Sequence, residues 1–187
     1  SCREGRIAVR VFITGYRHYE LGIFKDSQPE VKVLRDFLRQ RIINLAEEGA
    51  EWFIIQGYTG IEMYAANEII DLKEDYDIKL GVLKPFHKFD DRYNESDKIN
   101  LNNILEHADF HQFIFEREYG DPSMFKAINQ FVTAHSDYGL LVYDSESETN
   151  LKYIYSVMLE LSEKSHYNIE RIQFDDINDF INDRYDS

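Results

Sequence analysis

The chain has 187 residues, 43% of them hydrophobic, which excludes a disordered protein and is enough for one domain with a sizeable core. Asp and Glu outnumber Lys and Arg by 35 to 21, and the net charge of −14, with no basic stripe, argues against nucleic-acid binding. The single cysteine, Cys2, excludes an internal disulfide, and no run of about 18 apolar residues predicts a membrane span. We therefore expect a cytoplasmic protein.

The first half of the chain alternates between strand-like and helix-like patterns. Residues 7–14 form a β-branched run closed by Gly15 and predict the first strand. Ser27 and Glu30 resemble a capping box, with Pro29 in the first turn, for a helix whose apolar residues recur at 3.6-residue spacing. The segments that follow predict a helix end at Gly49, a strand over 51–56, a helix over 61–72, a strand over 78–83 ended by Pro85, and a loop over 86–96.

The second half continues this alternation. A helix beginning at Asp121 and Pro122 would bury one stripe, formed by Phe125, Ile128, Val132 and His135. The other predicted elements are a helix over 101–108, strands over 110–115, 138–143 and 169–174, and helices over 151–161 and 177–181.

Together these elements predict the fold class. Strands that are apolar almost throughout are typical of a parallel sheet buried on both faces, and the intervening helices fit βαβ crossovers. We expect an α/β, Rossmann-like three-layer sandwich with a mostly parallel sheet of about six strands. The whole of 1–187 would form one domain after a flexible start at 1–6.

The loop over 57–62 is the most informative candidate site. Ligands of open parallel sheets bind beyond the carboxyl ends of the strands, and here Gly-x-x-Gly joins a strand to a helix. Gly57 would allow a sharp turn, Gly60 the close approach of an anion to free N–H groups, and Thr59 a hydroxyl contact. Glycines at such junctions also occur for packing alone.

Glu62 and Arg17 have two interpretations each. Glu62 either grips a ribose hydroxyl or acts as a general base, or it is an acid stabilised by the helix dipole. Arg17 either pairs with a phosphate or lies in a solvated loop, and the same applies to His18 as a proton shuttle.

Further candidates lie in loops and on one helix. Tyr16, Tyr58 and Phe86 would stack on a base or pack against the domain edge. Lys126, Asn129 and Gln130 lie off the apolar stripe of their helix, as an exposed polar face would. A nucleophile elbow, a Walker A loop and a G-x-G-x-x-G fingerprint are absent, and the histidines and acids form no metal-ligand pattern. We expect no metal and no cofactor.

Seven motifs give the sequence a family resemblance. They are Thr14-Gly15-Tyr16, Glu20-Leu21-Gly22-Ile23-Phe24, Glu48-Gly49-x-Glu51-Trp52, Gly57-x-x-Gly60-Ile61-Glu62, Pro85-Phe86, Phe125-Lys126-x-x-Asn129-Gln130-Phe131, and His135-Ser136-Asp137 through Tyr143-Asp144. From about Val9 to its C-terminal helix, the chain resembles the YpsA family of Rossmann-like proteins. More distantly it is similar to DprA/Smf and to the LOG-type phosphoribohydrolases.

The resemblance implies a protein that handles nucleotides, nucleotide sugars or ADP-ribose-like molecules. Family members typically carry lysine in place of Arg17 and tryptophan in place of Tyr64. The arginines of the DprA R-N-R pattern are missing around Asn129, and the diglycine of the LOG loop is missing as well. The predicted ligand-binding residues are Gly15, Tyr16, Arg17, Glu20, Gly57, Thr59, Gly60, Glu62, Phe86, Lys126 and Asn129.

Three functions follow as hypotheses. The first is a non-catalytic sensor that binds a nucleotide-type ligand and reports it to a protein partner in bacterial growth or division control. The second is a nucleotide N-glycosidic hydrolase in which Glu62 is catalytic and Arg17 holds the phosphate. The third is a DprA-like binder of single-stranded DNA. The sequence leaves the oligomeric state open, and the resemblance adds a homodimer as one alternative, because proteins of this superfamily often dimerise.

Overall fold

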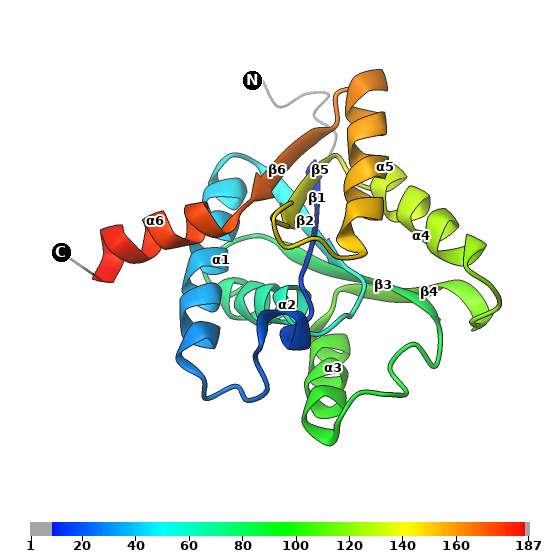
Figure 1. The fold of residues 1–187 in the computed structure, drawn as a ribbon, viewed down its shortest axis with the longest axis horizontal. Coiled ribbons are helices and arrows are strands. Elements are labelled where there is room, and N and C mark those ends of the chain that lie inside the picture. The colour runs from blue at the N-terminus through cyan, green and yellow to red at the C-terminus, as the bar shows by residue number, and fades with distance from the viewer. Residues whose placement is uncertain (1–8, 186–187) are drawn as a thin grey trace.

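A parallel six-stranded sheet forms the centre of the molecule. The computed structural model describes residues 9–185, so the predicted flexible start at 1–6 lies outside the described residues. The strand order is β4-β3-β2-β1-β5-β6, and every neighbouring pair is parallel (Figure 1). The strands are β1 (Val9–Gly15), β2 (Ala50–Ile55), β3 (Lys79–His87), β4 (Phe110–Glu118), β5 (Tyr138–Val142) and β6 (Asn168–Ile172).

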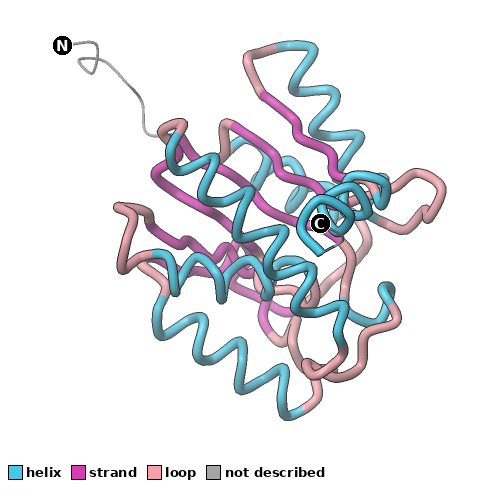
Figure 2. The backbone as a smooth tube through the Cα atoms, turned by 90° about the vertical axis from the view of Figure 1, so that its left-hand side faces the viewer, coloured by secondary structure: helices cyan, strands magenta, loops and turns pink. Residues whose placement is uncertain are grey.

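Helices cover both faces of this sheet, which confirms the predicted Rossmann-like α/β sandwich (Figure 2). On one side α1 packs on α2 and α2 on α3, and on the other side α4 packs on α5, while α6 lies against α1. The helices are α1 (Pro29–Glu47), α2 (Ile61–Leu72), α3 (Glu95–His107), α4 (Ser123–Ala134), α5 (Leu151–Lys164) and α6 (Phe174–Tyr185), with a 3-10 turn η1 (His18–Leu21) after β1.

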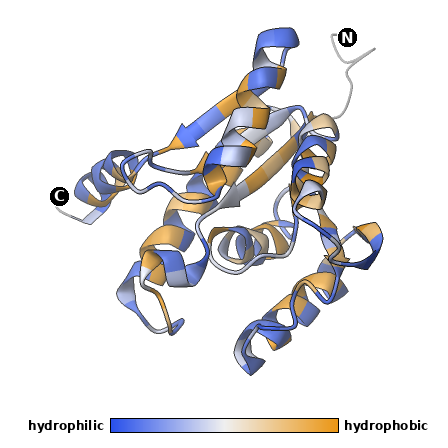
Figure 3. Cartoon of the chain, turned by 45° about the vertical axis from the view of Figure 1, so that its right-hand side comes forward, coloured by the Kyte–Doolittle hydropathy of each residue, from blue (hydrophilic) through white to orange (hydrophobic). Residues whose placement is uncertain are grey.

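The core explains why the strands read as continuous apolar runs. Val11, Phe12 and Ile13 of β1 are consecutive and fully buried, so both faces of this central strand are covered. Burial of each such side chain contributes about 1.5–3 kcal/mol. Figure 3 shows hydrophobic colour along the central strands, whereas β6, which leads to the C-terminal helix, is partly hydrophilic.

The predicted end of the third strand at Pro85 was wrong. β3 continues to His87, and Phe86 is a buried strand residue rather than part of a loop. The pairing with β2 stops at Val82, whereas pairing with β4 goes on to His87. One side of β3 therefore has no partner strand at Pro85, and the missing N–H interrupts no ladder there. β4 is likewise longer than predicted and includes residues 116–118.

Two helix predictions were also wrong in detail. The buried residues of α4 are Met124, Ile128, Val132 and Thr133, whereas Phe125 is 44% exposed and His135 is an exposed residue just after the helix. The stripe begins one residue earlier than predicted because Met124 faces the core. At α1 the N-cap is Gln28, not the predicted Ser27, and the Gln28 Oε1 accepts hydrogen bonds from the N–H groups of Phe24 and Lys25 instead.

Candidate ligand site at the carboxyl edge of the sheet

The topology selects one edge of the sheet as the candidate ligand site. From β1 the chain proceeds through β2 and β3 to β4 on one side, and it then crosses back to β5 on the other side. The strand order therefore reverses between β1 and β5, and ligands of open α/β sheets bind at such a point. Gly15 pairs with Val142, so the turn after β1 lies beside the loop that leads into α5.

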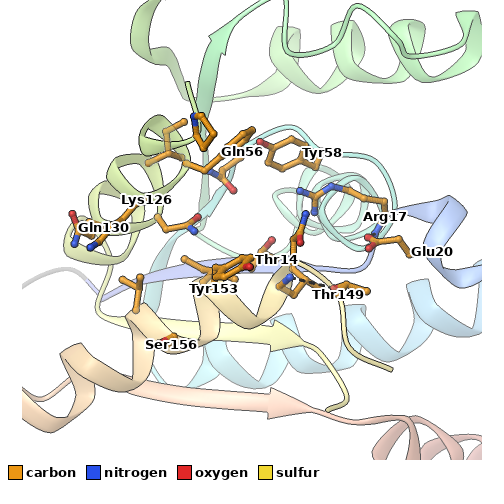
Figure 4. A pocket seen from close by; sticks show the side chains of 18 of the residues that line it. Thr14, Arg17, Glu20, Gln56, Tyr58, Lys126, Gln130, Thr149, Tyr153 and Ser156 are labelled. Carbon is orange, nitrogen blue, oxygen red and sulfur yellow. Dashed lines mark hydrogen bonds between the residues drawn. The ribbon is translucent and has the colours of Figure 1, made fainter. Parts of the chain in front are cut away.

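A cavity of about 640 Å³ opens at this edge (Figure 4). The end of β1 and η1 form one wall, the β2–α2 loop another, and α4 and α5 the remaining two. Four of the predicted binding residues line it: Arg17, Glu20, Lys126 and Asn129. The other seven do not: Gly15, Tyr16, Gly57, Thr59, Gly60, Glu62 and Phe86.

Arg17 projects over the ring of Tyr58. Its guanidinium carbon lies 3.7 Å from the ring centroid, and Nη1 donates to the Gly15 carbonyl at 3.2 Å. Among the described residues no carboxylate forms an ion pair with Arg17. Glu20 instead binds the Arg17 backbone N–H through Oε1 at 2.8 Å, which fixes the turn that carries the guanidinium. The positive charge of Arg17 is therefore available to a ligand.

Glu62 lies beneath the cavity and is completely buried. Its Oε1 accepts the N–H groups of Gln56, Gly57 and Tyr58 at 2.7, 3.0 and 3.2 Å, and its Oε2 accepts the Thr14 hydroxyl at 2.8 Å. Burial raises the pKa of the Glu62 carboxyl, and the nearby Arg17 charge opposes this. The N–H groups of this glycine turn are thus occupied by the protein's own Glu62 carboxyl, and Glu62 acts on the cavity only through the atoms it positions.

The second glycine of the turn serves close packing. Gly60 has φ = 80°, and a Cβ there would lie 2.3 Å from the backbone oxygen of Tyr16. The next residue, Ile61, donates its N–H to that same oxygen at 3.0 Å. Of the two interpretations of the glycine loop, packing therefore accounts for Gly60, while Gly57, with φ = 103°, takes part in the turn around Glu62.

The aromatic candidates separate into two groups. Tyr16 is buried, and its hydroxyl lies 3.0 Å from the Asp144 carbonyl oxygen and accepts the Asp144 N–H at 2.8 Å, so it joins two loops. Phe86 packs on Met124 inside the domain. Tyr58 does line the cavity, and burial raises its pKa to about 12, which keeps the phenol neutral at physiological pH.

His18 lies away from this cavity. Its Nδ1 is 2.9 Å from the Ile23 carbonyl oxygen, and its Nε2 is 3.1 Å from an oxygen of Asp97 in α3. These contacts fix the β1–α1 segment to α3. His18 does not line the cavity, so it is not placed to act as the predicted proton shuttle for a ligand bound there. In the described part of the chain, 9–185, no three His, Cys, Asp or Glu side chains gather as a metal site would require. No helix within those residues is long and apolar enough to cross a membrane.

Sequence reasoning missed part of the cavity wall. Thr14 and Gln56 are buried polar residues at the ends of β1 and β2, a placement that the strand-end rule could have selected. Tyr19 and Tyr153 carried no such signal, because an aromatic residue in a short turn or on a helix resembles ordinary packing. Both are instead exposed, at 61% and 56%, and both line the cavity, as does the exposed Phe125.

Comparison with known proteins agrees with this architecture. The YpsA family model, described as YspA SLOG family, matches residues 11–177. UPF0398 proteins of Staphylococcus saprophyticus and Staphylococcus haemolyticus are 42% and 38% identical over 174 residues, which cover 92% of this chain and 93% of each relative.

A solved structure of DNA processing protein A from Helicobacter pylori, described for its single-stranded DNA binding mode, has a similar fold. The TM-score is 0.52 at 18% identity, and the match covers 94% of this chain and 79% of that one. The fold thus agrees with the distant DprA similarity expected from the sequence. On the family match and the identity to the UPF0398 proteins, the chain belongs to the YpsA family.

Proposed function

We propose that this protein binds a nucleotide-type ligand in the cavity between β1, the β2–α2 loop, α4 and α5. One observation carries the proposal: Arg17, with no ion-pair partner among the described residues, projects over Tyr58 into a cavity of about 640 Å³ at the topological switch point. In a chain with a net charge of −14, an arginine in this position suits a phosphate group.

The aromatic side chains around the cavity support a planar base as the other half of the ligand. Tyr19, Phe125 and Tyr153 are all exposed and all line this one cavity. A fourth exposed ring, Tyr119, packs on Phe125 with the ring centroids 5.4 Å apart. Stacking of a base on an aromatic ring contributes about 1–3 kcal/mol to binding. A bound base would also cover rings that are exposed to solvent in the free protein.

The proposal is for binding without turnover. Glu62, the acid that a nucleotide N-glycosidic hydrolase would use here, is fully buried and accepts four hydrogen bonds from Thr14 and from the 56–58 backbone. A general base must come within hydrogen-bond reach of the substrate, whereas Glu62 is fully buried and does not line the cavity. Ligand sensing is therefore favoured over hydrolysis.

Single-stranded DNA is the second candidate, because the fold resembles that of a DNA processing protein whose structure is described for that activity. The charge balance of this chain opposes it. Nucleic-acid affinity arises largely from lysines and arginines that displace counterions, and here acids exceed them by 35 to 21.

Isothermal titration calorimetry with AMP, ADP-ribose, a nucleotide sugar and NAD tests the proposal, with chromatography of each mixture to detect products. We expect at least one nucleotide to bind and remain intact, with affinity reduced at least tenfold in Arg17→Gln, since one charge-assisted contact contributes about 1.5–3 kcal/mol. Arg92→Gln, an exposed loop arginine outside the cavity, is the matched control and should bind normally.

Other outcomes would change the conclusion. Release of a free base would restore the hydrolase hypothesis. Binding of a dT oligonucleotide, measured by fluorescence anisotropy at 0.15 M salt, without binding of any nucleotide would favour single-stranded DNA as the ligand. Equal affinities of Arg17→Gln and wild-type protein would show that this cavity is not the binding site.

A further inference from the structure

Two positive side chains line the cavity, and they come from opposite walls. Arg17 extends from the turn after β1, and Lys126 from the first turns of α4 (Figure 4). Among the described residues neither side chain forms an ion pair with a carboxylate. The two acids of the lining are already engaged: Glu20 binds the Arg17 backbone N–H, and Glu160 pairs with Lys164 at 3.1 Å.

The cavity is long enough to separate two anionic groups. Its lining positions on α5 run from Leu151 to Glu160, and a helical rise of 1.5 Å per residue makes this wall about 14 Å long. The section between the two cations is lined by uncharged polar and aromatic side chains, among them Thr14, Gln56 and Tyr153. Hydroxyls, amides and a ring of this kind suit a sugar and a base rather than a phosphate.

The backbone turn of residues 56–58, between β2 and α2, is where a phosphate would ordinarily bind, but its N–H groups already have an acceptor. The N–H groups of Gln56, Gly57 and Tyr58 all donate to the Glu62 carboxyl, so none of the three is free to bind a phosphate. Phosphate recognition in this cavity therefore relies on side-chain cations, which lie at its two ends.

Building on the function proposed above, we propose that the ligand carries a phosphate on each side of one nucleoside. One phosphate pairs with Arg17 and the other with Lys126, and the nucleoside lies between them. A nucleoside 3′,5′-bisphosphate has this arrangement, and so does an internal unit of a short oligonucleotide. ADP and ADP-ribose place their two phosphates side by side, so they can reach only one of the two cations at a time.

Calorimetry with adenosine 3′,5′-bisphosphate, adenosine 3′-monophosphate, adenosine 5′-monophosphate and ADP tests this inference. The bisphosphate should bind at least tenfold more tightly than the other three. In Arg17→Gln its affinity should fall to that of one monophosphate, and in Lys126→Gln to that of the other. Arg92→Gln should retain the full preference, and thermal melting of each variant checks that it is folded.

The outcomes separate the two proposals. If ADP or a monophosphate binds as tightly as the bisphosphate, the two-ended ligand is wrong, while nucleotide binding stands. If no nucleotide binds, both proposals are wrong. The dinucleotide pApA identifies the source of the ligand, since tenfold tighter binding than the bisphosphate indicates a nucleic-acid strand and equal or weaker binding indicates a free nucleotide.

Discussion

Replacement of Glu62 by alanine should destabilise the protein far more than loss of an ordinary first-turn acid. The substitution leaves the buried N–H groups of Gln56, Gly57 and Tyr58 without their acceptor, together with the hydroxyl of Thr14. Each buried donor left unsatisfied costs about 1–3 kcal/mol. Because water enters part of the space, we expect a total loss of roughly 3–5 kcal/mol in the free energy of unfolding.

Glutamine at the same position should be tolerated better. Its amide oxygen can still accept the three N–H groups, and its NH₂ can donate to the Thr14 oxygen, so Glu62→Gln should cost about 1–2 kcal/mol. Glu30→Ala is the matched control, because Glu30 is an exposed acid in the first turn of α1 and its helix-dipole contribution is about 0.3–1 kcal/mol.

Urea unfolding followed by the fluorescence of Trp52 measures these differences, with an unchanged denaturant slope as the sign that the unfolding transition is comparable. The reasoning is refuted if Glu62→Ala costs no more than Glu30→Ala. That result would mean that Glu62 acts as a simple dipole-stabilised acid, and that the turn after β2 does not depend on its carboxylate.

Three further predictions concern the same region. Burial raises the pKa of Glu62 in the folded state, so the protonated carboxyl stabilises the fold below its ordinary pKa of 4.5, and this stabilisation is lost as the pH rises. The unfolding free energy of the wild-type protein should therefore fall relative to that of Glu62→Gln between acidic and neutral pH. A difference between the two proteins that stays constant with pH would contradict this prediction. Gly60→Ala should cost roughly 2–4 kcal/mol in urea unfolding because its Cβ meets backbone at 2.3 Å, whereas Gly22→Ala, also at positive φ but with nothing within 4 Å, should cost about 1–2. Tyr16→Phe should lower the unfolding free energy by about 1–3 kcal/mol, because the hydroxyl loses its contacts with the Asp144 backbone. An unchanged unfolding free energy would mean that the Tyr16 hydroxyl does not stabilise the contact between the two loops.

Sequence reasoning succeeded for the central strands. The continuous apolar runs at Val11 and Phe53 predicted buried parallel strands, because a strand covered on both faces is apolar at successive positions. It failed where neighbours decide. Pro85 reads as a strand end in any sequence, yet it lies within β3 because one side of the strand has no partner there.

The candidate site divides in the same way. The sequence placed Arg17 among the candidates because it follows the first strand, and the family resemblance added Glu20, Lys126 and Asn129; all four line the cavity. It could not place Glu62, whose interpretation as ligand contact or structural acid depended on where the carboxylate points.

The sequence by itself therefore determined the alternation of strands and helices, and with it the edge of the sheet that is the candidate ligand site. Hydrophobic periodicity and the residue preferences of turns are properties of short segments, so they can be recognised without a structure. Only the tertiary structure decided that the glycine turn encloses Glu62, whose second oxygen binds Thr14 from another strand. The same holds for the cavity itself, because Arg17 and Lys126 are far apart in the chain and line one cavity only when the turn after β1 and the start of α4 meet at the same edge of the sheet.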